Sequence, residues 1–241
     1  MRVSMEESGR IPTYISGLDD RLGGGVPKGH IVLVSGPAGS LKSTLVYRIL
    51  WHAAVERGLA GLYLSMEQSR KSLMAQMSAF GMDPGRAKTL NVIDVRGLRR
   101  ELETTSMQPH WLLGLREQLT RYKAELGCDL LAVDSLDALY ALTPFENPRN
   151  EIFQFLEEVR DLDATVFLVS EMPADRRTFG AYNVEEFLAD GILHMRIKEV
   201  DIGLTTSVRR FVAILKMRGV EHDMDYYPLL VQKGRFEIVT D

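Results

Sequence analysis

The sequence contains a single cysteine, Cys128, and this scarcity excludes a framework of internal disulfides. Because Cys128 precedes an apolar strand, we expect its thiol to be buried and chemically inert. The first ten residues lack the apolar core of a signal peptide. No apolar run approaches the ~20 residues that a membrane-spanning helix requires. These absences predict a cytoplasmic protein that does not enter a membrane.

An excess of basic residues is also lacking, since the formal net charge is −4. This balance argues against a broad nucleic-acid-binding surface, although it leaves a local basic patch possible. His30, His52, His110 and His194 do not have the spacing of a metal site. The chain also has no internal repeat and no low-complexity linker. Its 241 residues predict one domain, with a core at about 11–190 and a β extension at about 191–241.

What the chain does contain is a glycine-rich stretch between an apolar run at 31–34 and a helical pattern. This stretch consists of Gly36, Pro37, Ala38, Gly39, Ser40, Leu41, Lys42, Ser43 and Thr44. A strand, a tight turn and a helix in this order form a P-loop, whose backbone N–H groups cradle phosphate oxygens. Lys42 is then expected to reach the β- and γ-phosphates, and the Ser43 hydroxyl to bind Mg²⁺. The alternative is a fortuitous glycine turn before an ordinary helix.

Leu41 departs from the P-loop pattern, which has glycine before the lysine. Glycine at that position lets the backbone approach the phosphates without a side chain in the way. The Leu41 side chain must therefore point away from the nucleotide, or it disturbs the site.

Apolar runs and helical patterns alternate along most of the chain. Strands are predicted at 61–66, 91–95, 129–134 and 164–170, and helices at 43–57, 69–80, 111–126 and 148–162. This alternation predicts an α/β fold with a mostly parallel sheet between helices. Strand patterns at 192–198, 207–217 and 229–239 predict antiparallel strands that extend the sheet. Ser16 is expected to cap a short helix at 17–22, and 96–110 to form a variable surface excursion.

Acidic residues end three of the predicted strands. Asp134 follows an apolar strand and is suited to hold Mg²⁺, and Glu67 is placed to orient or deprotonate an attacking water. The carboxyl ends of parallel strands meet at one edge of a sheet, so Lys42, Glu67, Asp134 and Glu171 are expected to share one crevice. For Glu67, a simple surface carboxylate is the alternative.

These segments together resemble the KaiC-like branch of the RecA/RadA superfamily of ATPases. The matching segments are 16–19 with the glycines at 23–25, the P-loop, 63–67, 131–135, 183–191, 214–219, His222 and 227–228. The resemblance implies a RecA-like fold that binds ATP and Mg²⁺, and a homo-oligomeric ring, such as a hexamer, with nucleotide at the subunit interfaces. It also implies that Lys216 and Arg218 act on the γ-phosphate of a neighbouring subunit, and that His222 contacts the nucleotide. Without the resemblance, Lys216 and Arg218 would be assigned to an ordinary basic edge strand, and His222 to a structural role.

The chain departs from the KaiC pattern at several positions. Gln68 replaces the second of two adjacent glutamates, so hydrolysis depends on Glu67 alone, and Met224 replaces a base-contacting lysine. One ATPase domain stands where KaiC has two in tandem, so clock function and autophosphorylation do not carry over. The sequence thus predicts a slowly hydrolysing, ring-forming ATPase that serves as a regulatory switch with an unknown protein partner. The alternatives are a non-hydrolysing nucleotide-binding scaffold and a RadA-like DNA-binding recombination protein, which the acidic balance disfavours.

Overall fold

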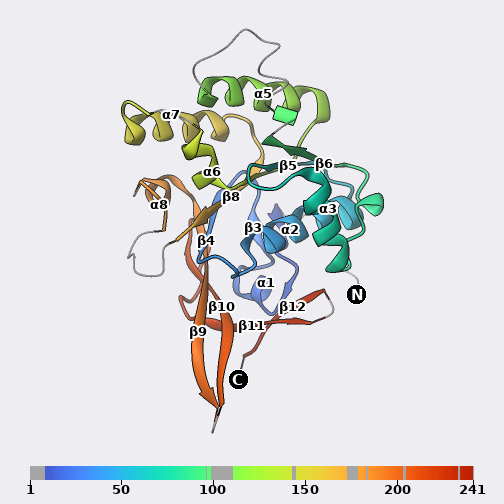
Figure 1. Ribbon diagram of the computed structural model, residues 1–241, viewed down its shortest axis with the longest axis vertical. Helices are drawn as coiled ribbons and strands as arrows, with labels where there is room; N and C mark the ends of the chain where they lie inside the picture. Colours follow the sequence, from blue (N-terminus) through green and yellow to red (C-terminus); the bar gives the residue numbers. More distant parts are fainter. Residues whose placement is uncertain are drawn as a thin grey trace.

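The fold is known from a computed structural model that describes residues 9–95, 97–98, 111–142, 145–172, 179–182, 184–202, 205–232 and 234–240. A large sheet runs through the molecule, with helices on both sides (Figure 1). Its strands follow the order β2-β12-β11-β10-β9-β4-β8-β7-β5-β6. The strands from β9 to β6 are parallel to one another, while β9, β10, β11 and β12 form antiparallel pairs. The expected α/β fold, mostly parallel with antiparallel C-terminal strands, is confirmed.

The central strands are short and mostly apolar, as expected for strands covered on both faces. They are β4 (Ile31–Gly36), β5 (Gly61–Ser65), β6 (Leu90–Asp94), β7 (Leu130–Asp134) and β8 (Thr165–Glu171). The extension consists of β9 (Gly191–Ile202), β10 (Thr205–Met217), β11 (Tyr227–Gln232) and β12 (Arg235–Ile238). Near the N-terminus are β1 (Arg10–Ile11), β2 (Ile15–Ser16) and β3 (Val26–Pro27), of which β1 and β3 pair with each other.

Successive side chains of β4 enter two different cores, because neighbouring residues of a strand point to opposite faces. Val32 and Val34 pack with α2 (Lys42–Arg57) and α3 (Arg70–Ala79). Ile31 and Leu33 pack with α5 (Trp111–Leu126), α6 (Leu136–Ala141) and α7 (Pro148–Arg160). Shorter helical turns are α1 (Leu18–Arg21), a 3-10 turn at Pro84–Arg86 and α8 (Glu185–Leu188). The sheet is thereby held between helices on both faces.

The structure corrects two predictions in the chain's end regions. Ser16 lies in β2 and does not cap α1, whose N-cap is Gly17. The strand predicted at 229–239 is a hairpin of β11 and β12 that turns at Gly234. A side chain at Gly234 would place its Cβ 2.2 Å from the Phe80 carbonyl oxygen, and its φ of +76° also favours glycine.

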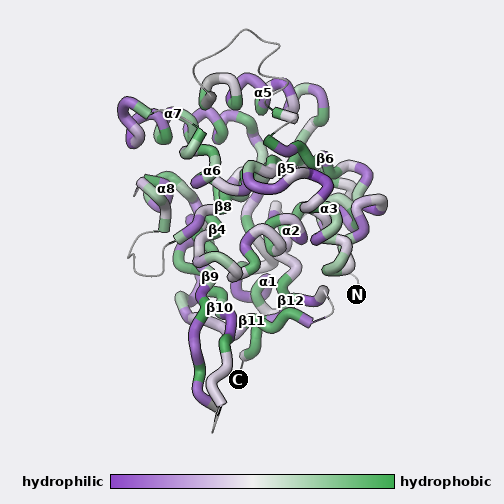
Figure 2. The backbone as a smooth tube through the Cα atoms, in the orientation of Figure 1, coloured by the Kyte–Doolittle hydropathy of each residue, from purple (hydrophilic) through white to green (hydrophobic). Residues whose placement is uncertain are grey.

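The other predictions for these elements agree with the structure where it describes them. The predicted excursion at 96–110 lies outside the described residues, apart from 97–98. Cys128 is buried, and burial raises the pKa of its thiol. Within the described part of the chain, no helix combines the length and apolarity needed to cross a membrane. The strands β9 and β10 project from the body as a long ribbon, along which hydrophilic residues are prominent on β9 (Figures 1 and 2).

Candidate functional site

The glycine-rich stretch forms the connection from β4 to α2, as the P-loop pattern predicts. The helix α2 begins at Lys42, and its N-cap residue Leu41 makes no side-chain capping hydrogen bond. By contrast, Ser69, Ser135 and Asn147 accept capping bonds at the starts of α3, α6 and α7. The first N–H groups of a helix carry partial positive charge and need acceptors. The start of α2 is therefore suited to receive an anion.

Two glycines of the loop are required by its geometry. A Cβ at Gly36 would lie 2.4 Å from the Met195 carbonyl oxygen, so only glycine lets β4 end this close to β9. Gly39 has a φ of +78°, a left-handed conformation that glycine adopts without strain. Leu41 adopts a φ of +75° as well, in spite of its side chain. That side chain packs partly against the core and also lines the cleft beside the loop.

Lys42 is buried at the inner side of the loop. Its Nζ donates hydrogen bonds to the carbonyl oxygens of Gly36 at 2.8 Å and Pro37 at 3.0 Å. Burial lowers the pKa of Lys42, and the nearby carboxylates of Glu171, Asp134 and Glu67 oppose this shift. An ammonium group surrounded by carboxylates and carbonyl oxygens is placed to exchange these contacts for phosphate oxygens.

Asp134 ends β7 near the start of α2, and the residue is 7% exposed. The Ser43 hydroxyl donates to one carboxylate oxygen at 3.1 Å, and the Tyr63 hydroxyl donates to the other at 2.5 Å. Burial raises the pKa of Asp134, while the hydrogen bonds from Tyr63 and Ser43 act in the opposite direction. Tyr63 lies in a segment used for the resemblance, but no role was predicted for it, because a tyrosine within an apolar strand is ordinarily a core residue.

Glu67 follows β5 and is held by Ser135, the residue after Asp134. The Ser135 hydroxyl donates a short hydrogen bond to the Glu67 carboxylate and accepts one from the Ala138 amide at the start of α6. One serine thus caps a helix and fixes a carboxylate. Ser135 lies within a segment used for the resemblance, but its contact with Glu67 depends on the pairing of β5 with β7.

These groups surround one cleft of about 210 Å³ at the carboxyl edge of the sheet. Its lining consists of Ala38, Gly39, Leu41, Lys42, Ser43, Thr44, Glu67, Gln68, Gln76, Asp134, Ser135, Val169 and Glu171. The prediction that Lys42, Glu67, Asp134 and Glu171 share a crevice is therefore confirmed. Gln76, on α3, was missed because a single polar residue on a surface helix carries no sequence signal.

The oxygen ligands in this cleft fit Mg²⁺, which prefers carboxylates, waters and substrate phosphates to an all-protein cage. The Ser43 hydroxyl and the Asp134 carboxylate lie together next to the loop. Among the residues that the structure describes, no group of three or more His, Cys, Asp or Glu side chains forms a closed metal site. A magnesium ion at Ser43 and Asp134 would thus depend on phosphate and water for its remaining ligands.

Lys216 and Arg218 lie toward the opposite end of the strands from the P-loop. In the strand register Lys216 is opposite Ile192, and Ile192 is opposite Leu33. The Arg218 amide donates to the Asp190 carbonyl oxygen, and the Asp190 amide donates to the Ile31 carbonyl oxygen. The six residues of β4 place its two ends ~16 Å apart at 3.3 Å per residue. Arg218 is level with the first of these residues, and the P-loop follows the last.

The alternative that assigned these two residues to an ordinary edge strand does not agree with the sheet order. The strand β10 lies between β9 and β11, because the C-terminal chain returns to add β11 and β12 beyond it. However, β11 pairs with β10 only at Phe211 and Val212. His222 does not line the cleft either, and its Nδ1 makes a 2.9 Å hydrogen bond with the Val220 carbonyl oxygen.

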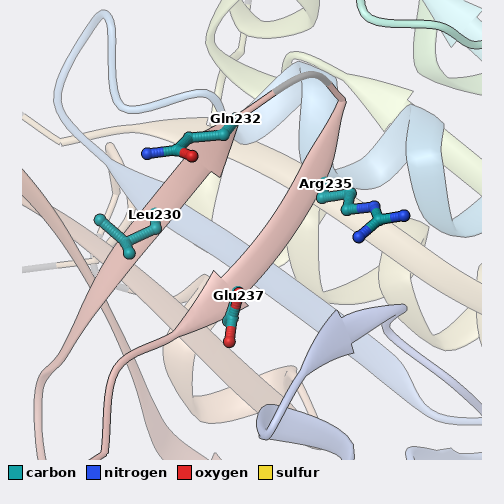
Figure 3. A pocket seen from close by; sticks show the side chains of 4 residues that line it. All are labelled: Leu230, Gln232, Arg235 and Glu237. Atoms are coloured by element: carbon teal, nitrogen blue, oxygen red, sulfur yellow. The ribbon is translucent and has the colours of Figure 1, made fainter.

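A larger hollow, of about 560 Å³, lies on the β11–β12 hairpin (Figure 3). Leu230 and Gln232 border it from β11, and Arg235 and Glu237 border it from β12. It shares no lining residue with the cleft at the P-loop. Although this hollow is larger, the smaller cleft contains the lysine, the carboxylates and the uncapped helix end, and is the better candidate site.

Known proteins resemble this chain over most of its length. Residues 11–241 match the family model described as "ATPase: KaiC". A UPF0273 protein of Aeropyrum pernix is 30% identical over 237 residues, which cover 93% of this chain and 92% of that protein. The circadian clock oscillator protein KaiC of Prochlorococcus marinus is 26% identical, over 91% of this chain but only 43% of its own length. This chain therefore spans less than half of that clock protein.

Among solved structures, a KaiC-like protein of Pyrococcus horikoshii has a similar fold. The TM-score is 0.79 at 23% sequence identity, with 96% of this chain and 99% of that chain covered. The structural likeness extends over the C-terminal strands as well as the P-loop core.

Proposed function

Because the chain belongs to the KaiC family of ATPases, we propose that it binds ATP with Mg²⁺, hydrolyses it slowly and acts as a ring-forming regulatory or signalling switch. The observation that carries this proposal is the convergence of Lys42, Ser43, Asp134 and Glu67 on one cleft at the uncapped start of α2. In this proposal residues 11–190 form the ATPase core and residues 191–241 the β extension of one domain.

The residues that converge on the cleft have separate tasks in this function. The N–H groups at the start of α2 and the Lys42 ammonium bind the phosphates, and Ser43 and Asp134 hold Mg²⁺. The metal, when bound, neutralises charge that develops on the transferred phosphoryl group. The Glu67 carboxylate, fixed by Ser135, orients the attacking water and accepts its proton.

Arg218 is supplied from a neighbouring subunit. Because it is level with the beginning of β4 while the P-loop follows the end of β4, a cis contact with the γ-phosphate would require a large rearrangement. A head-to-tail contact between copies places such a group over the next copy's cleft, and closed contacts of this kind form rings. Charge stabilisation by an arginine in trans is worth about 10³–10⁵-fold in turnover in comparable phosphoryl-transfer enzymes.

The first experiment is a titration with Mg-ATP, followed by thermal unfolding and by native mass measurement. Binding to the folded state stabilises it by about 2.7 kcal/mol at a hundredfold excess of free ligand over Kd. Wild type should therefore melt at a higher temperature, and the mass should report assembly. Lys42→Ala provides the matched control without phosphate affinity. An unchanged midpoint for wild type at millimolar Mg-ATP would contradict the proposal.

The second experiment tests the supply of Arg218 in trans. Arg218→Ala and Lys42→Ala should each be nearly inactive, since one lacks the arginine and the other lacks a working P-loop. In randomly mixed rings at equal amounts, about one quarter of the interfaces join an intact P-loop to an intact arginine, whatever the ring size. Mixing should thus restore up to about a quarter of the wild-type turnover. If mixed rings form and hydrolysis stays absent, the trans assignment is wrong.

A non-hydrolysing nucleotide-binding scaffold is the second candidate. It is favoured by Leu41, a residue with a left-handed backbone that lines the cleft, and by Gln68, which brings an amide where a second carboxylate could stand. This candidate predicts that ATP binds and drives assembly while phosphate release stays at the level of Lys42→Ala. Measurable release that Glu67→Gln abolishes would exclude it.

A further inference from the structure

Arg218 is held from inside the protein by a buried carboxylate. The side chain of Asp190 is 7% exposed, whereas that of Arg218 is 53% exposed. We infer that Asp190 is a positioning residue for Arg218, and that it fixes the guanidinium in the orientation in which a neighbouring copy's phosphate meets it. This inference depends on the proposed function, since it assigns a residue to the site that acts in trans.

Asp190 is itself rigidly fixed by three elements of the fold. One of its carboxylate oxygens accepts hydrogen bonds from the Ile31 amide at 3.0 Å and from Arg160 at 2.8 Å. The other oxygen accepts a bond from Arg218 at 2.8 Å. The carboxylate therefore ties the start of β4 and the end of α7 to the end of β10. A carboxylate with this many fixed donors leaves its arginine partner little freedom.

Arg218 is the more exposed of the two arginines that bind Asp190. Arg160 also forms an ion pair with Glu157 at 3.8 Å, so the guanidinium that Asp190 presents to a phosphate is that of Arg218. A second Arg218 nitrogen donates to the Phe187 carbonyl oxygen at 3.1 Å. These contacts use two of the five N–H groups of a guanidinium. The described contacts thus orient the group without using all of its donors.

Lys216 makes different contacts from Arg218, although both belong to the same Lys-x-Arg element. Its Nζ donates to the carbonyl oxygens of Glu186 at 2.9 Å and Ala189 at 2.6 Å, with that of Phe187 at 3.4 Å. An ammonium has three donors, and three carbonyl oxygens surround this one. Lys216 therefore fastens the chain at 186–189 to β10. This segment carries the Phe187 carbonyl oxygen that binds Arg218, and Asp190 directly follows it.

Such preorganisation affects turnover because an arginine that is ordered before the reaction loses little entropy during it. A displacement of a catalytic group by about 1 Å can lower a rate ~10²-fold. Asp190→Asn keeps the size of the side chain but removes its charge and replaces one acceptor by a donor. We expect turnover to fall by about 10²-fold, while binding of Mg-ATP by the P-loop of the same subunit is kept.

Mixed rings distinguish a role of Asp190 in positioning Arg218 from a purely structural role. Asp190→Asn has an intact cleft, and Lys42→Ala supplies an intact pair of Asp190 and Arg218. Mixing the two variants should restore hydrolysis to the extent that mixing Arg218→Ala with Lys42→Ala does. A variant whose defect is misfolding of its own cleft cannot be rescued in this way.

The matched control is Arg160→Gln, which removes the other cation on Asp190 and leaves the Ile31 amide and Arg218 in place. It should lower thermal stability as Asp190→Asn does, without the loss of turnover. If Asp190→Asn fails to fold, Asp190→Glu keeps the charge, moves the carboxylate by one methylene and should show the same rescuable loss. The ratio of the affinities of the assembled ring for ATP and ADP serves as a measurement that does not require turnover. Arg218→Ala and Asp190→Asn should each lower this ratio to a similar extent.

The outcomes distinguish this inference from the proposed function. Full turnover in Asp190→Asn, or a defect that Lys42→Ala cannot rescue although it rescues Arg218→Ala, overturns the positioning role of Asp190. If neither variant is rescued in rings shown to be mixed, the trans supply of Arg218 itself is wrong. If wild type binds no nucleotide, both proposals fall.

Discussion

The hydroxyl of Tyr63 offers the sharpest test of how the cleft is built. Tyr63 is fully buried and donates a 2.5 Å hydrogen bond to Asp134, a carboxylate that is itself buried. Tyr63→Phe keeps the ring and removes only this donor. Hydrogen bonds to charged groups contribute ~1.5–3 kcal/mol, and a buried charge that loses one is not rehydrated. We therefore expect the free energy of unfolding to fall by about 2 kcal/mol, which lowers the thermal midpoint by ~4–8 °C for a chain of this size.

Tyr47→Phe is the matched control for this change. Tyr47 is also fully buried and lies edge-on to Tyr63, with ring centroids 5.5 Å apart. Among the residues that the structure describes, its hydroxyl reaches only the Met74 sulfur, at 3.9 Å, which is a weak acceptor. Loss of this hydroxyl should lower the free energy of unfolding by less than about 0.5 kcal/mol.

The effect of Tyr63→Phe should depend on pH with a defined sign. Burial raises the pKa of Asp134, and the bond from Tyr63 opposes that rise, so the variant should have the higher Asp134 pKa. The stability that this bond contributes is present above the Asp134 pKa, where the carboxylate is charged, and diminishes as pH falls through it. Thermal midpoints from about pH 8 to about pH 4 should therefore converge for wild type and Tyr63→Phe. Equal midpoints for Tyr63→Phe and Tyr47→Phe at every pH would refute this role of the hydroxyl.

Three further predictions concern the cleft. Glu67→Gln should lower single-turnover hydrolysis by about 10²–10⁴-fold with little change in the Kd for ATP, and an unchanged rate would leave Glu171 as the next candidate base. Asp134→Asn should weaken the dependence of hydrolysis on Mg²⁺. Without nucleotide the variant should melt no lower than wild type, because burial raises the Asp134 pKa and so disfavours the charge that the substitution removes; a lower midpoint would contradict this prediction. Leu41→Gly relieves a left-handed conformation worth ~1–2 kcal/mol and loses apolar packing of similar size, so calorimetry should show tighter ATP binding at nearly unchanged stability; unchanged affinity would show that Leu41 does not hinder the phosphates.

Much of the fold was predictable from local patterns. Apolar runs separated by helical periods placed the central strands and the helices α2, α3, α5 and α7 close to their observed bounds, because burial on both faces of a parallel sheet demands continuous apolar residues. The short helix α6 was not predicted. The spacing of glycines before Lys42 predicted the loop, and strand-terminal acids predicted Glu67 and Asp134 at its edge. In each case the relevant information lies within a few residues of the chain.

The sequence by itself therefore determined the fold class, the P-loop and the acids that share its cleft. Only the tertiary structure decided which residues support them. Tyr63 meets Asp134 because β5 pairs with β7, and Asp190 meets Arg218 because β10 returns antiparallel to β9. The position of β10 inside the sheet, rather than at its edge, likewise depends on the hairpin that follows it. Such contacts join residues far apart in the chain through strand order and register, which periodicity and spacing along a single sequence do not specify.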